Sequence, residues 1–227
     1  YYYRGPVEHL VLPPTAHGRD EASWAAAALA EEGVRWVVLV EQPAANWDAD
    51  GLAHAGLGEQ YAPALKTDAA GWAVTLYAAQ SQALLAAETV FANGAVLMAY
   101  AVEPARAVPA GTLVVHLQWD VTEMADAQTA LKVFVQLLDK QGRLATQQDQ
   151  PLEWKGADAA GIASYGILLP ETLTPGEYTL IAGLYRPDED GAPRVPLRAD
   201  AQQDHAVLQT VIIVPAGSCE ADWATTG

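Results

Sequence analysis

Short stretches in which apolar residues occupy every second position recur through the last two thirds of this chain. They include residues 113–119, 131–138, 178–185 and 207–214, and they are punctuated by Pro, Gly, Asp and Asn. A period of two is typical of strands that bury one face, and several such strands at short spacing indicate a sandwich or a barrel. The alternation therefore constrains the fold far more than it constrains any chemistry.

The beginning of the chain has a different pattern, which predicts a small α/β unit. A capping residue and acidic charge precede an Ala-rich helix expected over residues 24–32, and Gly33 stands where that helix would end. The nearly continuous apolar run 34–40 follows and predicts a strand covered on both faces. A short helix is expected within residues 52–61.

A hairpin is expected to complete this unit. Its strands, 61–66 and 72–78, flank a turn in which Gly71 supplies the positive φ. The polar stretch 80–82 that follows has the character of a linker. We therefore expect a small α/β unit over residues 1–82 and a second domain over residues 83–227.

The second domain is predicted to be an antiparallel Ig-like or jelly-roll-like β-sandwich, so the chain as a whole is mainly β. The expected strands cover residues 89–91, 95–102, 112–121, 131–138, 143–148, 162–169, 178–185, 195–197 and 207–214. No helical pattern alternates with them, which favours antiparallel pairing. Within 113–121 the alternation puts Trp119 on the same face as four aliphatic residues and His116 on the other, so Trp119 is expected in the core.

Charge and cysteine content exclude several kinds of partner. Asp and Glu total 28 against 12 Lys and Arg, a net charge of −16, which disfavours nucleic acid and anionic lipid as partners. The single cysteine, Cys219, permits neither an internal disulfide nor a multi-cysteine metal site. The chain starts at Tyr1 without Met, which suggests a processed product or a piece of a longer protein, and the apolar stretch 69–87 is too interrupted to predict a membrane helix.

Metal, nucleotide and nucleophile chemistry have little support. The histidines are scattered, so no zinc site is predicted, no phosphate-binding glycine motif occurs, and no cofactor is expected. Asp188 and Asp190 lie in an acidic turn that is either a charged hairpin tip, which we favour, or a weak calcium site. A Ser-His-Asp triad could be assembled with Ser164 or Ser23 as the nucleophile, but neither serine stands in a Gly-x-Ser-x-Gly motif.

Carbohydrate recognition is the remaining hypothesis, because sugars bind aromatic faces flanked by carboxylates and amides. Trp47, in an Asn-Trp-Asp turn, and Trp154, between Glu153 and Lys155, are the tryptophans least explained as core residues. Each is either a sugar platform or a loop anchor, and the anchor is the favoured alternative. Gln147 and Asp149 would supply hydrogen bonds, although polar residues facing outward from a strand need no such role.

The ordered strands and turns resemble one family. The resemblance rests on Phe91-x-Asn93-Gly94, Pro109-x-Gly111-x-Leu113, Leu117-x-Trp119, residues 133–139 with Gly142, Gln147-x-Asp149-x-Pro151, Leu168-Leu169-Pro170, residues 175–178 and Gly183-Leu184-Tyr185. In this order, over residues 88–214, they are similar to the extracytoplasmic C-terminal domains of bacterial polytopic membrane glycosyltransferases, those similar to dolichyl-phosphate-mannose protein mannosyltransferases.

The resemblance implies an extracytoplasmic module, tethered to the membrane through the rest of its protein. The catalytic acid of such transferases lies in their membrane part, so no catalytic residue is transferred to this chain. Its expected role is non-catalytic, positioning an acceptor or the membrane domain, with the membrane-embedded remainder and a glycan as partners. The alternatives are a free-standing surface carbohydrate-binding module and a structural subunit of a cell-surface assembly.

Overall fold

The chain forms two compact units. A computed structural model of the 227-residue chain describes residues 18–41, 48, 50–79, 83–124, 130–152 and 160–217. The first unit comprises Tyr1–Gln80 and the second Ser81–Gly227. The expected linker, residues 80–82, lies outside the described residues.

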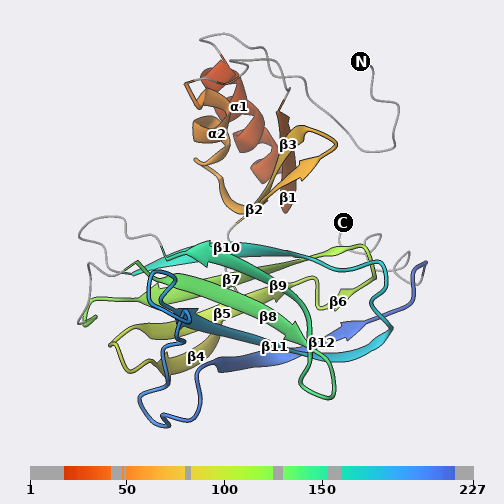
Figure 1. Cartoon of the computed structure of the whole chain (residues 1–227). Coiled ribbons are helices and arrows are strands. Elements are labelled where there is room, and N and C mark those ends of the chain that lie inside the picture. Colours follow the sequence, from red (N-terminus) through yellow and green to blue (C-terminus); the bar gives the residue numbers. More distant parts are fainter. Residues whose placement is uncertain are drawn as a thin grey trace. The chain divides into compact units, whose positions relative to one another are not determined.

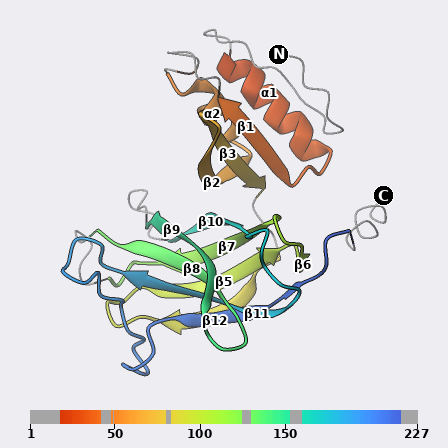
Figure 2. The same cartoon turned by 45° about the vertical axis from the view of Figure 1, so that its right-hand side comes forward.

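The first unit combines two helices with a three-stranded antiparallel sheet. Its elements are α1 (Gly18–Glu31), β1 (Trp36–Glu41), α2 (Leu52–Leu57), β2 (Tyr61–Ala69) and β3 (Trp72–Ala79), and the strand order is β1-β3-β2. Figure 2 shows α1 running alongside the sheet. The β2–β3 hairpin turns at Ala70 and Gly71, which have φ of 54° and 84°, as a tight hairpin requires.

The sheet of the first unit has one covered face and one open face. Leu39, Tyr61 and Tyr77 pack with residues of α1 and α2 in a small hydrophobic core. Trp36, Val38 and Val40 point the opposite way, and Val38 retains 56% of its surface exposed. The expectation that this strand is buried on both faces is wrong, because β1 is an edge strand of an antiparallel sheet with helices against only one side. The first helix also starts earlier than expected, at Gly18.

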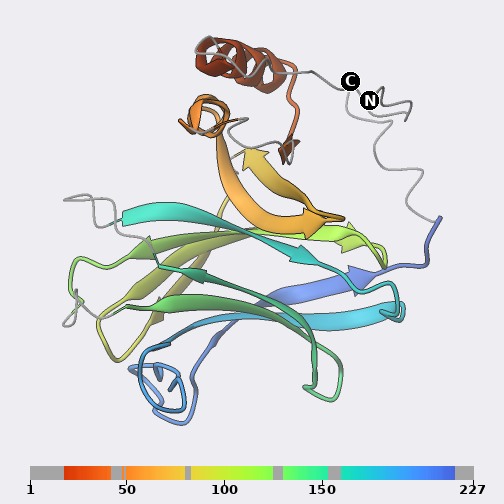
Figure 3. The same cartoon turned by 45° about the horizontal axis from the view of Figure 1, so that its top comes forward.

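The second unit is an antiparallel β-sandwich, so the chain has the predicted fold class. Its elements are β4 (Leu85–Val90), β5 (Val96–Glu103), β6 (Arg106–Ala107), β7 (Thr112–Asp120), β8 (Lys132–Leu138), β9 (Leu144–Pro151), β10 (Ala160–Leu168), β11 (Gly176–Tyr185) and β12 (Ala206–Ile213). One sheet has the order β10-β7-β5-β4 and the other β6-β12-β11-β8-β9. Figures 1 and 3 show these sheets as two layers.

Two details of the sandwich differ from the prediction. Residues 195–197 form no strand: the segment makes only isolated bridges, from Arg194 to Tyr185 and from Leu197 to Phe91. The very short β6 was not expected, and it pairs parallel with the end of β12, whereas the other pairs among the described strands are antiparallel. A two-residue strand has too little alternation to be recognised in a sequence.

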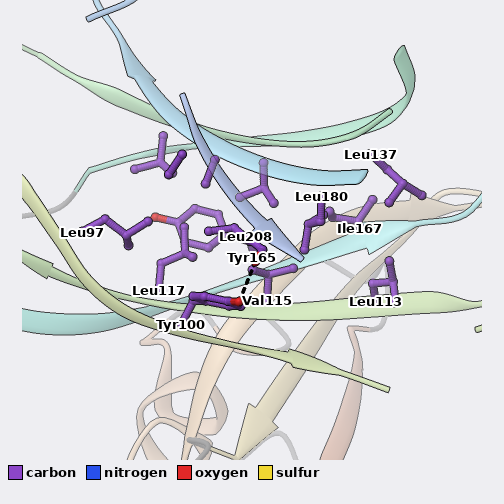
Figure 4. Close-up of a cluster of buried hydrophobic side chains, with 14 of the residues drawn as sticks. Leu97, Tyr100, Leu113, Val115, Leu117, Leu137, Tyr165, Ile167, Leu180 and Leu208 are labelled. Carbon is purple, nitrogen blue, oxygen red and sulfur yellow. Dashed lines mark hydrogen bonds between the residues drawn. The ribbon is translucent and has the colours of Figure 1, made fainter. Parts of the chain in front are cut away.

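The core lies between the two sheets and is built from the alternating residues. Leu113, Val115 and Leu117 of β7 face Leu180 and other apolar residues of the second sheet. Trp119 is 3% exposed and belongs to this core, as predicted. In Figure 4 the Tyr100 hydroxyl reaches across the core, where it donates a 2.6 Å hydrogen bond to the Leu208 carbonyl oxygen. The two sheets are thus joined by a buried polar bond as well as by apolar packing.

Neither helix in the described part of the chain has the length and apolar character that crossing a bilayer requires.

Candidate functional site

The two described residues expected to bind sugar lie together on the outside of the sandwich. Gln147 and Asp149 belong to β9, the edge strand beside β8. Gln147 is directly opposite Gln136, and Asp149 is directly opposite Phe134. Opposite residues share a face of the sheet, and the neighbouring β8 residues such as Val135 point into the core. All four side chains are therefore on the outer face of the five-stranded sheet.

A β-bulge determines this arrangement. The β8–β9 register shifts between Leu137 and Leu138, so Leu138 pairs with Leu144 but Leu137 pairs with Thr146. Without that extra residue, Gln147 and Asp149 would be on the opposite side from Phe134 and Gln136, because a one-residue slip reverses the face of every side chain. The bulge brings the two amides and the carboxylate beside the aromatic ring.

Tyr185 of β11 contributes the next part of the site. Its hydroxyl donates a 3.1 Å hydrogen bond to Asp149 Oδ2. Desolvation, and then the bond to this carboxylate and its charge, raise the pKa of Tyr185, which keeps the phenol protonated and a donor. Asp149 Oδ1 is buried, and no hydrogen-bond partner is found for it among the described residues. The carboxylate thus retains an unused acceptor atom, although the side chain as a whole is only half-buried.

Phe134 and Arg194 form the centre of the site. The Phe134 ring lies directly against Gly183, where an added Cβ would be 2.3 Å from the ring Cζ and 2.7 Å from the Asp204 carbonyl oxygen. Only glycine allows the ring to lie so close to β11. The Arg194 guanidinium sits 4.2 Å from the ring centroid, a cation–π contact, and Tyr185 packs beside the same ring at 6.5 Å between centroids.

Arg194 also begins a chain of hydrogen bonds across the strands. It donates to Gln136 Oε1 at 3.0 Å, and Gln136 Nε2 donates to Gln147 Oε1 at 2.9 Å. The other side of the guanidinium lies 3.4 Å from Asp204, which also bonds to His205 at 2.7 Å. Desolvation raises the pKa of the Asp204 carboxyl, but the His205 bond and the Arg194 charge more than offset it, so the pKa is lowered.

We call Phe134, Gln136, Gln147, Asp149, Tyr185 and Arg194 the polar outer face. It combines amide, carboxylate, phenol and guanidinium groups around aromatic rings on a rigid sheet. The hydrogen-bonding groups match the hydroxyls of a sugar ring, whereas the Phe134 ring is 2% exposed and supports Arg194 without itself presenting a face to a ligand. Arg194 and Tyr185 were missed in the sequence because β11 and the segment after it reach this face only in the folded sheet. Phe134 of β8 was missed because the sequence does not show which β9 residue lies opposite it. One sequence signal could have found Phe134. It stands between Val133 and Val135, which face the core, so the alternation of the strand puts its ring on the outer face.

The other candidate residues do not join this site. Trp47 and Trp154 lie outside the described residues. Asp188 and Asp190 are exposed, next to Glu189, which pairs with Arg186 at 3.3 Å. Within the described ranges no group of three His, Cys, Asp or Glu side chains is placed to hold a metal ion.

Ser164 has a histidine partner, but the pair is interior. Ser164 Oγ and His116 Nδ1 are 2.9 Å apart and lie on directly opposite positions of β10 and β7. Both side chains are buried, so His116 occupies a polar pair within the sheet rather than the solvated surface. Such a cross-strand bond satisfies two polar groups that burial would otherwise destabilise.

A second polar cluster, not foreseen in the sequence, holds the first unit together. His54 of α2 bonds through Nδ1 to the Tyr77 hydroxyl and through Nε2 to Glu41 Oε1 at 3.0 Å. The Asp48 carboxylate accepts the backbone N–H groups of Ala53 and His54 and so caps α2. Desolvation, followed by the charges of Glu41 and Asp48, raises the pKa of Tyr77 to about 12. The cluster ties α2 to β1 and β3.

Comparison with known proteins identifies similar shapes only. No protein-family model matches the chain, and no curated protein matches its sequence. Two glycosyl hydrolase family 2 members from Bacteroides cellulosilyticus are similar at 10% and 11% identity, covering 52% and 62% of this chain. A β-glucuronidase of the same hydrolase family is 7% identical over 52% of this chain. The TM-score is 0.31 in each case, and the match spans 14%, 16% and 12% of those longer chains respectively. Similarity at this level assigns no family.

Proposed function

We propose that this chain is a non-catalytic, extracytoplasmic module that binds glycan on the polar outer face. The observation that carries the proposal is the half-buried Asp149 carboxylate, which has one oxygen held by Tyr185 and the other without a described partner. Asp149 Oδ1 is buried in the free protein, so a sugar hydroxyl reaches it only when the side chains over it move aside. The bond formed there is charge-assisted and about twice as strong as a neutral one. The site needs no metal or cofactor to do this.

Two exposed side chains near Asp149 add hydrogen-bond donors to the same surface. Gln147 is exposed at the edge strand and Arg194 is exposed above Phe134. Both keep donor capacity beyond the bonds they make within the protein, since Arg has five N–H donors and an amide has two. A sugar on this surface would contact the Tyr185 ring edge while its hydroxyls bond to Asp149, Gln147 and Arg194.

The setting of this module is the second part of the proposal. The ordered turns of residues 88–214 resemble the extracytoplasmic domains of membrane glycosyltransferases, and a glycan-binding face would position an acceptor for the membrane part of such a protein. The reading frame of the gene tests this directly. We expect it to encode several membrane-spanning helices upstream of Tyr1. A secretion signal without such helices would contradict the proposed attachment to a membrane domain, but it would not affect the proposal that the chain binds glycan, which has its own test.

Glycan binding is tested with an oligosaccharide array followed by titration calorimetry on the strongest ligand. Asp149→Ala and Gln147→Ala should each weaken binding by about tenfold or more, which corresponds to one lost hydrogen bond of about 1.4 kcal/mol. Asp188→Ala is the matched control and should bind as the native chain does, because Asp188 is an exposed turn carboxylate that takes no part in the hydrogen bonds of the polar outer face.

Tyr185→Phe separates the two roles of that side chain. The phenyl ring remains, but the hydroxyl that holds Asp149 Oδ2 is lost. We expect a decrease of about threefold to tenfold in affinity with an unchanged circular dichroism spectrum. An array without any bound glycan, or equal affinity of Asp149→Ala and Asp188→Ala, would overturn the proposal.

A further inference from the structure

The outer edge of β1 is open. The strand order puts β1 at the end of its sheet, and no described strand lies beside its free edge. Ala79 N donates to Arg35 O at 2.8 Å, which places residue 35 at a hydrogen-bonded position against β3. Because such positions alternate in an antiparallel pair, Val37 and Leu39 also bond to β3, and Trp36, Val38 and Val40 direct their backbone groups to the open edge.

Nothing within β1 protects this edge. Its sequence, Trp-Val-Val-Leu-Val-Glu, contains no proline and no bulge, and its only charge is at the last residue. The other edge of the same sheet, β2, is protected in three ways: Pro63 lacks a donor, the register shifts between Pro63 and Leu65, and Lys66 adds a charge. Natural proteins use these devices to prevent strand addition. Their absence from β1 marks it as a pairing edge.

The sequence of β1 is complementary to itself. An antiparallel pair of two copies, centred on Val38, uses Trp36, Val38 and Val40 of each copy for its hydrogen bonds. In that register Trp36 is opposite Val40 of the second copy, and Arg35 is opposite Glu41 at both ends. Arg35 and Glu41 would be at non-hydrogen-bonded positions, where side chains are closest. Glu41 already bonds to His54 of its own copy at 3.0 Å, so Arg35 would share that carboxylate with His54, and the opposite-charge pair adds only a small favourable contribution.

The side chains on the open face support the same partner. Trp36, Val38 and Val40 are 38%, 56% and 49% exposed, and their neighbours Leu76 and Val74 on β3 are half-buried on the same face. We propose that β1 pairs antiparallel with β1 of a second copy of this chain, which joins the two three-stranded sheets into one continuous six-stranded sheet. The exposed apolar side chains of β1 in one copy would then lie beside those of β1 in the other copy, on the same face of the joined sheet.

Cysteine cross-linking tests the register. In a Cys219→Ser background, Val38→Cys places two thiols opposite each other at the two-fold axis, with Cα atoms about 5.5 Å apart, a distance that a disulfide spans. Val207→Cys is the matched control: Val207 is 66% exposed but lies on β12, inside the five-stranded sheet. We expect the Val38→Cys dimer to form at least about tenfold faster. Equal rates in the two variants would overturn the proposal.

Sedimentation of the native chain tests the association itself. We expect the mass to double as concentration rises, and Val38→Lys to raise the dissociation constant by about tenfold or more because two lysines would meet at the axis. Val207→Lys should have no effect. Arg35→Glu should weaken the dimer at low salt and less so at 1 M salt, where charges are screened. A chain that stays monomeric, or a dimer indifferent to Val38→Lys, would contradict the pairing.

Discussion

The outer face of the five-stranded sheet and the open face of the three-stranded sheet each lack a covering layer of described strands or helices within their own unit, but their chemistry is opposite. The first carries the polar network around Arg194, Asp149 and Tyr185. The second carries Trp36, Val38 and Val40, whose only hydrogen-bonding side-chain group is the indole N–H of Trp36. One surface is equipped to bind a polar ligand and the other to pack against an apolar one.

The difference follows from how each unit obtains its core. In the sandwich the inner faces of two sheets bury each other, so the outer face can carry polar groups without loss of stability. Among the described residues of its unit, the three-stranded sheet is covered by α1 and α2, and they cover one side. Its second apolar face adds nothing to the core of the single unit. Four predictions test this contrast, from the largest expected effect to the smallest.

Gly183→Ala should cause the largest loss, about 3 kcal/mol of unfolding free energy. The new Cβ would meet the Phe134 ring and the Asp204 carbonyl oxygen, neither of which can move freely. Gly161→Ala on β10 is the control, since its Cβ would have no neighbour within 4 Å, and we expect a change below about 0.5 kcal/mol. Urea unfolding measures both. Similar losses in the two variants would show that the polar outer face is not tightly packed.

Tyr77→Phe should change how the first unit responds to alkali. The folded-state pKa of Tyr77 is raised to about 12, so the native chain holds this proton more tightly than the unfolded chain does. Its contribution to stability is complete below pH 10 and is lost as the pH rises towards 12. Between pH 9 and 11 the native chain should lose about 1 kcal/mol more than Tyr77→Phe. Hydrogen exchange of the β3 amides measures the stability of the first unit at each pH. If the stability of the two proteins changes with pH in the same way, the predicted contribution of Tyr77 is wrong.

Arg194→Met should lower stability by about 1 kcal/mol or less, because it removes a partly exposed cation–π contact and the bond to Gln136 but keeps an apolar chain over Phe134. Arg198→Met, at another exposed arginine of the same segment, serves as the comparison. Thermal unfolding measures both. If the two variants unfold alike, Arg194 covers the ring without stabilising it.

Val38→Lys should have the smallest effect on the single chain, below about 0.5 kcal/mol, because Val38 is already more than half exposed. The same change at the fully buried Val135 should prevent folding, since an unpaired charge would enter the core. The measurement is chemical unfolding at a concentration low enough to keep the chain monomeric. A large loss for Val38→Lys would mean that the open face is covered within the chain.

The sequence predicted those parts of the fold in which local pattern and tertiary structure agree. Alternation in β7 and β11 identified the core faces, including Trp119, because each of these strands directs alternate residues into the core between the two sheets. Gly71 identified the turn of the β2–β3 hairpin by the positive φ that this turn requires. The run 34–40 was misjudged, because continuous hydrophobicity does not distinguish a strand buried on both faces from one with an open apolar face.

The site was predictable only in part. Gln147 and Asp149 were selected as polar residues near a loop, but their meeting with Phe134 depends on a bulge that leaves no distinct sequence signal. Arg194 reaches the site from a segment that forms bridges rather than a strand. Contacts of this kind arise from the folded sheet and not from spacing along the chain.

The most direct test of glycan recognition is a ¹H–¹⁵N correlation spectrum of the chain recorded during titration with manno-oligosaccharides and with the strongest ligand from the array. The proposal predicts saturable shifts confined to β8, β9, the end of β11 and the Arg194 side chain, and their loss in Asp149→Ala. Saturable shifts elsewhere, such as at β1, or shifts that persist in Asp149→Ala, would contradict it.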